Sequence, residues 1–317
     1  MFSLLPALFL GSAVAGQQQE DQASEELQVS TVIKTVRWTE ETRDAISSSI
    51  LTTARSIDSW MSGEISEGKN KSRINIGVEQ SFEKSGEMET DFYIRGKLDI
   101  PNTKRKLKLF FDSDTNDQSS LEDKRLNNNE ESFSTAGVSR ERTGDVFDLS
   151  HDIGAKFKIP FDPFYRFKAK HKRELNELWK MGFEQRLWYY HRKGWGESSE
   201  LNFTRLLGDQ HSVIFTTEIQ YQNRYEEFEF GQFATLRQAI PGNHWHSFTL
   251  GITGSSQPDQ QTDSVFLSAS YNQLIYKDWL ILSARPILRF PDSDNWKPNP
   301  ELEIRLDVFF QETTKRN

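Results

Sequence analysis

The sequence has no cysteine and, after its first 15 residues, no long apolar run. The lack of cysteine rules out disulfide bonds and fits a protein that crosses an oxidising compartment without them. The lack of an apolar run of about 18 residues excludes transmembrane helices. Only 35% of the 317 residues are hydrophobic, so a large water-soluble core is not assured. The net charge of -8 carries no signature of nucleic-acid binding.

The first residues read as an export signal. An apolar stretch from Phe2 to Leu10 precedes Ala13-Val14-Ala15, the small-x-small pattern that signal peptidase cleaves. No Lys or Arg precedes the apolar stretch, so a short membrane anchor is the alternative. We expect residues 1–15 to be a signal peptide. Residues 16–38 are predicted to be a polar linker, disordered over residues 17–28.

One amphipathic helix is predicted over residues 39–62. Thr39 is a suitable N-cap, and Glu40 and Glu41 follow in the first turn, where carboxylates favour the helix dipole. Apolar residues then recur at spacings of three and four. They are Ile46, Ile50, Ala54, Ile57 and Trp60 or Met61. Two roles stay open for this helix: packing on or plugging the domain that follows, or docking to a partner or a membrane surface.

From Ser72 almost to the end, apolar residues recur with a period of two, which indicates amphipathic strands. The last of these segments is the clearest, because five apolar residues from Leu302 to Phe310 alternate with charged ones. We count 13 candidate strands. They cover residues 74–82, 92–100, 107–111, 147–159, 165–171, 183–190, 201–205, 213–221, 228–240, 248–252, 265–271, 280–288 and 302–310.

The pattern predicts an all-β fold, an antiparallel transmembrane β-barrel over residues 72–311. A single-chain bacterial barrel has an even number of strands, so one of the 13 assignments is wrong. Either a further strand lies between Thr115 and Gly144, or one strand has been split in two. We therefore expect about 12 strands, within a range of about 12 to 14, preceded by the amphipathic helix.

Strand length and aromatic content favour a membrane barrel over a soluble sandwich. Seven of the 13 alternating segments span at least 9 residues, whereas strands of soluble sheets average about 5 or 6. The chain has 23 Phe, 8 Tyr and 8 Trp, and many of these lie at strand ends, as in the aromatic girdles of membrane barrels. The girdle candidates are Trp179, Trp188, Tyr189, Tyr190, Trp195, Trp245, Tyr271, Tyr276, Trp279 and Trp296.

Several segments resemble known outer-membrane proteins. The closing strand ends on the aromatic Phe310, as outer-membrane barrels at large do, although residues 311–317 follow it. The stretch from Ile57-Asp58-Ser59-Trp60 to the turn at 98–103, and the turn at 193–197, are similar to those of uncharacterised proteobacterial outer-membrane β-barrel proteins with an N-terminal helix. The resemblance implies a location in the bacterial outer membrane and a barrel fold, and it implies no activity.

The polar face of the third to fifth candidate strands is strongly basic. Its cations alternate with apolar residues and must point into the lumen, because each would cost about 2 to 4 kcal/mol at the lipid midplane. This predicted basic wall consists of Lys106, Lys108, Lys156, Lys158, Arg166, Lys168, Lys170 and Lys172. Acids such as Glu184 and Asp307 are expected to point inward from other strands. The lumen is therefore either closed by ion pairs or water-filled and favourable to anions.

A catalytic site has one candidate, the cluster from His244 to Ser247, which lacks the sequence context of outer-membrane phospholipases. We predict no catalytic residues, no cofactor and no metal. The predicted function is a non-enzymatic outer-membrane barrel, either a narrow channel or a structural envelope protein. Alternatives are a lipid-modifying or lipid-hydrolysing enzyme, and an adhesin that uses residues 116–143 or the helix.

The expected partners follow from the location rather than from any motif. They are outer-membrane lipid and lipopolysaccharide, and the barrel-insertion machinery during biogenesis, with no nucleic acid.

Overall fold

The structure is a computed structural model that describes residues 72–100, 107–112, 120–126, 135–157, 161–240, 244–257, 261–276 and 279–311, together with Thr42, Asp44, Ala45 and Ser48. The chain divides into two units, residues 1–50 and 51–317. In the first unit the four described residues are helical. The remainder of the predicted helix, the signal peptide and the linker lie outside the described residues and stay predictions.

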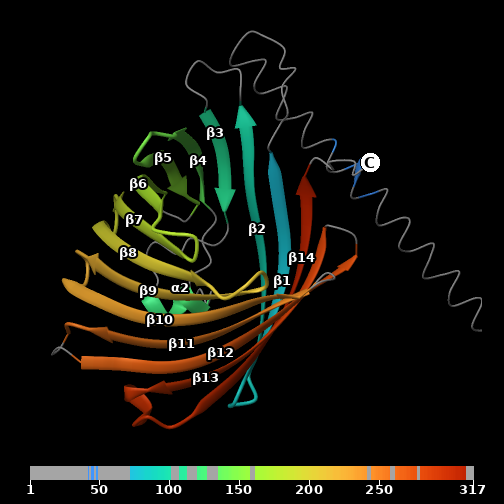
Figure 1. Cartoon of the computed structure of the whole chain (residues 1–317). Helices are drawn as coiled ribbons and strands as arrows, with labels where there is room; N and C mark the ends of the chain where they lie inside the picture. Colours follow the sequence, from blue (N-terminus) through green and yellow to red (C-terminus); the bar gives the residue numbers. More distant parts are fainter. Residues whose placement is uncertain are drawn as a thin grey trace, which may run out of the picture. The chain divides into compact units, whose positions relative to one another are not determined.

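The second unit contains a closed antiparallel barrel of 14 strands (Figure 1). Each strand pairs with its neighbours in sequence, and β1 pairs with β14 to close the ring. The strands are β1 (Arg73–Glu83), β2 (Met88–Ile100), β3 (Leu107–Asp112), β4 (Thr135–Arg142), β5 (Asp148–Lys156), β6 (Asp162–Glu174), β7 (Trp179–Tyr190), β8 (Gly194–Leu206), β9 (His211–Gln222), β10 (Glu227–Ile240), β11 (His244–Ser255), β12 (Gln261–Tyr276), β13 (Leu280–Pro291) and β14 (Asn299–Gln311).

Two short helices accompany the strands in the described part of this unit. One is α2 (Leu121–Leu126), between β3 and β4, and the other is the 3-10 helix η2 (Asp292–Asp294), between β13 and β14. Among the described residues, no helix is long and apolar enough to cross a membrane.

The barrel has 14 strands, so the favoured count of about 12 is wrong and the upper end of the expected range is correct. The strand missing from the 13 candidates is β4, which lies in the segment between Thr115 and Gly144. One face of β4 carries only Ala136 and Val138 as apolar residues before Arg140 and Arg142, so its alternation is weak. The register places Ala136 beside Ala155 and Val138 beside Ile153, and this pairing with β5 compensates for the weak pattern.

The outer face of the barrel is apolar and exposed. Phe92 is 75% exposed and Ile153 is 66% exposed, and further large apolar side chains alternate along most strands in the same way. An apolar surface of this extent is stable in lipid and not in water, and a closed barrel leaves no unpaired strand edge. This is the architecture of an outer-membrane barrel, with strands that cross the bilayer.

Aromatic side chains gather near the strand ends of this outer face. The rings of Trp195 and Tyr221 lie 5.0 Å apart, and Phe228 lies 4.6 Å from Tyr221. Between β12 and β13, Tyr276 meets the buried Trp279 edge to face, with ring centroids 5.5 Å apart. Such rings have an apolar body and a polar edge, which suits the boundary between lipid and water.

Candidate functional site

The inner face of the barrel is identified by α2, which is seen within the ring behind β9 and β10 (Figure 1). Its side chains contact Glu218 on β9 and Phe233 on β10. Residues paired across antiparallel strands share a face. The register joins Glu218 to Glu200, Glu200 to Glu184, and Glu184 to Lys170, so the even-numbered residues of β6 also point inward.

Apolar contacts fix α2 to the wall. Leu121 and Leu126 are each 1% exposed and form one buried cluster with Phe233, Phe266 and Ile287. Burying a leucine side chain stabilises the docked state by about 1.5 to 3 kcal/mol. These partners lie on β10, β12 and β13, so a helix of six residues is anchored to several strands.

A capping interaction explains why α2 begins where it does. The Ser120 hydroxyl accepts a hydrogen bond from the Asp123 backbone N–H at 3.1 Å and donates to the Asp123 carboxylate at 2.6 Å. The Glu229 carboxylate of β10 accepts a bond from the Leu121 N–H at 2.8 Å. The bonds from the Asp123 N–H and the Leu121 N–H satisfy backbone donors that a helix N-terminus leaves free.

The basic end of α2 neutralises buried acids of the barrel. The Arg125 guanidinium lies 2.9 Å from the Glu200 carboxylate and 3.1 Å from that of Glu218. Lys124 lies 3.5 Å from Glu218, whose side chain is only 3% exposed. Without α2, these acids would face one another in the wall, because Glu200 and Glu218 are directly paired in register.

The acidic end of α2 faces β13, where Glu122 lies 3.7 Å from the Arg289 guanidinium. Burial raises the pKa of the Glu122 carboxyl, although Ser264 and Arg289 oppose the rise. Burial likewise raises the pKa of Asp123, against the hydrogen bond from Ser120.

The inner face of β8 to β13, which α2 contacts, is called the covered wall below. The inner face of β14 and β1 to β7 is called the open wall.

The predicted basic wall falls on the open wall. Of its eight residues, Lys106 and Lys158 lie outside the described residues. Lys108 lies 2.6 Å from Glu141 and 3.6 Å from Asp99, and it also faces inward through its register with Ser139.

The β6 part of the basic wall divides into paired and exposed cations. Arg166 pairs with Asp152 at 3.3 Å, and the single carboxylate of Glu184 takes Lys168 at 3.7 Å and Lys170 at 2.6 Å. Lys172, near the end of the strand, is exposed. The basic wall is therefore mostly cross-linked by ion pairs, with its last cation facing solvent.

Lys156 stands apart from the other basic residues, because it is 4% exposed and its ammonium lies 4.7 Å from the centre of the Tyr190 ring. Tyr190, Trp188 and Phe164 form a buried inner cluster. The sequence interpretation that placed Trp188 and Tyr190 in an aromatic girdle is wrong. Successive side chains of a strand point to opposite faces, so only Tyr189, which lies between them and is 51% exposed, faces outward.

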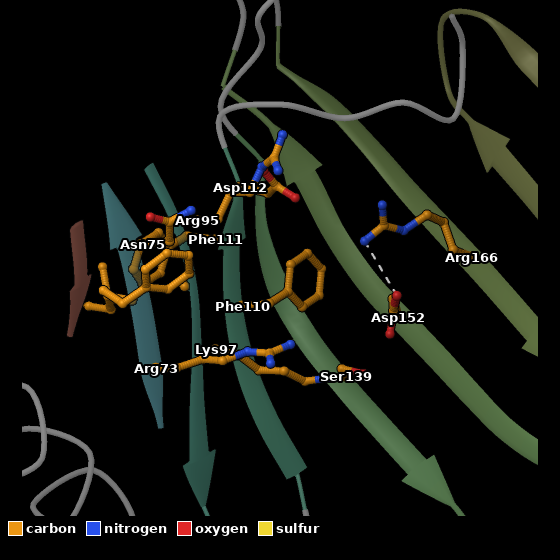
Figure 2. Close-up of a pocket in the computed structure, with 13 residues that line it drawn as sticks. Arg73, Asn75, Arg95, Lys97, Phe110, Phe111, Asp112, Ser139, Asp152 and Arg166 are labelled. Carbon is orange, nitrogen blue, oxygen red and sulfur yellow. Dashed lines mark ion pairs between the residues drawn. The ribbon is translucent and has the colours of Figure 1, made fainter. Parts of the chain in front are cut away.

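Two cavities lie against the inner face, the first wholly against the open wall and the second where β6 and β7 of the open wall meet β8 of the covered wall. The first has a volume of about 470 Å³ and is lined by residues of β14 and β1 to β6 (Figure 2). Its charged lining residues are Arg73, Arg95, Lys97, Asp112, Asp152 and Arg166. The second has a volume of about 510 Å³ and lies against β6 to β8, with Lys170, Lys172, Glu174, Lys180, Glu184 and Glu200 as its inward charges.

Sequence reasoning missed Arg73, Arg95 and Lys97 as lumen cations. The signal was present, because each alternates with apolar residues of β1 or β2. Sequence reasoning also missed α2, for which no comparable signal exists. The helix has six residues, and its partners on β8 to β13 lie at least 75 positions further along the chain.

The catalytic candidate does not assemble. The rings of His244 and His246 pack against Tyr271, with centroids at 6.3 and 5.1 Å. Ser247 follows His246 directly in β11, so the two side chains point to opposite faces of the sheet. Among the described residues, no group of His, Asp and Glu could hold a metal ion.

No protein-family model matches the chain, and no curated protein matches it in sequence. The predicted resemblance to proteobacterial proteins with an N-terminal helix therefore stays a prediction.

Several solved outer-membrane channels are similar in structure. A bacterial polysaccharide outer membrane secretin has 11% identity and a TM-score of 0.47, over 78% of this chain and 100% of that chain. The outer membrane channel DcaP of Acinetobacter baumannii has 8% identity and a TM-score of 0.47, over 76% and 97%. The CymD monoaromatic hydrocarbon channel has 7% identity and a TM-score of 0.46, over 78% and 90%. At these identities and scores the likeness concerns fold and does not decide what the barrel does.

Proposed function

We propose that the chain is a narrow, non-enzymatic channel of the outer membrane, in which α2 is a fixed constriction. One observation carries this proposal: α2 occupies the covered wall, while the first cavity lies wholly against the open wall and the second lies against β6 and β7 of the open wall and the adjoining β8. A structural protein with a filled lumen would need no such division. Solutes would pass between α2 and β1 to β7.

A weak preference for anions is part of the proposal. The first cavity is lined by four cations and two carboxylates, which favours anions. The exposed Lys172 of the second cavity adds to this preference. Rings of like charge at a constriction select ions of opposite charge. The preference should be small, because Lys108, Arg166 and Lys170 each have a carboxylate within ion-pair distance.

Planar-bilayer recording of the purified full chain tests this function. We expect discrete conductance steps and a reversal potential, in a KCl gradient, that favours chloride. Folded protein that inserts without conductance would contradict the channel and leave a structural envelope protein. We also propose, as consequences of the location, contacts with lipopolysaccharide and passage through the barrel-insertion machinery. Deleting residues 1–15 should then abolish export.

A further inference from the structure

The cavity of about 470 Å³ on the open wall has the size of a small-molecule site rather than of a bare ion path. Figure 2 shows its lining residues on adjacent strands, with Phe110 beside the ion pair of Arg166 and Asp152. Such sites combine an apolar surface with a few polar groups that fix orientation. Each of these elements can be assigned to residues of the cavity.

The charged element is a pair of like charges. Arg73 of β1 and Lys97 of β2 are direct register partners, an arrangement that destabilises a sheet unless an anion lies between them. Among the described residues, Lys97 forms an ion pair with one carboxylate, that of Glu141, which also pairs with Lys108. Within the part of the chain that the structure describes, Arg73 is exposed and makes no ion pair. An anion that contacts both cations would relieve the repulsion.

The other cations of the cavity are already committed. Arg166 pairs with Asp152 at 3.3 Å and lies over the Phe110 ring at 5.2 Å. Arg95 lies 3.5 Å from Asp112 and 5.0 Å from the centre of the Tyr93 ring. The carboxylate of a ligand would therefore be bound by Arg73 and Lys97.

The apolar element consists of Phe110 and Phe309, which line the cavity from β3 and β14. Phe110 packs one side against Phe164, with ring centroids 6.2 Å apart, and stays partly exposed. A flat apolar face of a ligand can lie against such a ring.

The third element is an unused acceptor. The Asn75 amide donates to the Asp307 carboxylate at 2.9 Å, which fixes the orientation of the amide, because a carboxylate can only accept. Its carbonyl oxygen is buried and has no hydrogen-bond partner. A buried acceptor without a donor costs about 1 to 3 kcal/mol, so a hydroxyl donor on a ligand would be favourable here.

Resting on the proposed channel function, we propose that this cavity binds small organic acids that carry one carboxylate, one flat apolar face and one hydroxyl donor. Arg73 and Lys97 bind the carboxylate, Phe110 and Phe309 contact the apolar face, and the Asn75 carbonyl oxygen accepts from the hydroxyl. The binding is reversible and includes no covalent step.

Isothermal titration of the detergent-purified full chain with 4-hydroxybenzoate tests this assignment. We expect saturable binding that weakens roughly tenfold or more in the double variant Arg73→Gln, Lys97→Gln, since charge-assisted hydrogen bonds are lost. The uncharged 4-hydroxybenzyl alcohol should bind at least about tenfold more weakly than the acid, for the same reason. Benzoate, which lacks the hydroxyl, should bind the wild type more weakly than 4-hydroxybenzoate does. The Asn75→Ala variant should bind benzoate as tightly as the wild type does.

The matched control is the double variant Arg173→Gln, Arg205→Gln. It removes the same net charge as the test variant, but from the outer face. Both residues lie at the rim where β1 begins and where β6 and β8 end, and there the Arg205 guanidinium lies 5.6 Å from the centre of the Trp179 ring. Its affinity for 4-hydroxybenzoate should equal that of the wild type. Equal affinity of wild type and the Arg73, Lys97 variant would overturn the assignment, as would full competition by chloride or phosphate.

Conductance separates this inference from the function on which it rests. Conductance steps that 4-hydroxybenzoate neither blocks nor modulates, together with absent binding, would overturn the ligand class and leave the channel standing. Saturable binding by folded protein that never conducts would overturn the channel and leave the binding site.

Discussion

The covered and open walls neutralise their charges in different ways. On the covered wall, Glu200 and Glu218 are met by Arg125 of α2, which is distant in sequence. On the open wall, cations such as Lys108 and Arg166 are met by acids of adjacent strands. The charges of the covered wall therefore determine where the helix sits. Those of the open wall border the cavities and influence what can enter them.

The largest effect is expected from Arg125→Ala, which leaves the buried Glu218 with one fewer cation. Removing one partner of a buried ion pair costs about 3 kcal/mol, or roughly a hundredfold in the equilibrium for detaching α2. The chain has no cysteine, so Leu126→Cys introduces a single thiol in a position that is 1% exposed. Its labelling rate by a maleimide should rise roughly a hundredfold in the Arg125→Ala background. An unchanged rate would mean that Arg125 does not hold the helix.

Detaching α2 outright should widen the channel. The double variant Leu121→Asp, Leu126→Asp places two carboxylates in the apolar cluster with Phe233 and should raise single-channel conductance about twofold or more, because the constriction is lost. Leu207→Asp is the matched control, since Leu207 is 43% exposed in a turn. If both variants conduct like the wild type, α2 does not limit flow.

The same substitution should act differently on the two walls. Glu141→Gln leaves Lys97 and Lys108 without their shared carboxylate, so the ratio of chloride to potassium permeability should rise about twofold. Glu218→Gln on the covered wall should change that ratio much less, because its side chain is 3% exposed beneath α2. Reversal potentials in a KCl gradient measure both. Equal shifts would remove the distinction between the walls.

The smallest effect is expected from pH. The raised pKa values of Glu122 and Asp123 mean that the docked helix binds protons more tightly than the detached helix. Docking is therefore strongest below the ordinary carboxyl pKa of about 4 and weakens as the pH rises through the raised values. The labelling rate of the thiol in the Leu126→Cys variant, divided by that of free cysteine, should rise modestly between about pH 4 and 7. With Glu122→Gln and Asp123→Asn added, the labelling ratio should not change with pH. A slope that persists would place the titration in another carboxyl that contacts α2, and Glu229 is the one to test.

Sequence reasoning predicted the class of fold and most of the strands, because a barrel that faces lipid on one side and water on the other must alternate. It left a further strand between Thr115 and Gly144 as one of two alternatives and did not locate β4, whose outward face carries two small or medium apolar residues and then two arginines. It placed Trp188 and Tyr190 with the girdles because composition alone does not tell which of two adjacent aromatics faces inward.

The candidate site was harder to predict than the fold. A list of inward cations follows from the pattern, but the pairing of Arg166 with Asp152, or of two lysines with Glu184, depends on register. The register of a barrel is set by closure of the whole ring, so a pair of strands considered alone does not determine it.

Glycine positions show the same dependence on register. A Cβ at Gly77 would collide with the Tyr93 ring, and one at Gly251 with the Phe266 ring. These glycines let a neighbouring aromatic lie flat across the strand, as aromatic residues do over glycines in barrels.

The placement of α2 also sets an order of events during assembly. The helix belongs to the connection between β3 and β4, yet its polar and apolar partners lie on β8, β9, β10, β12 and β13, at least 75 residues later. Contacts this distant in sequence form late, after the strands that supply them have paired. The newly closed barrel is therefore wider inside than the mature one, and it narrows only when the helix settles onto a finished wall.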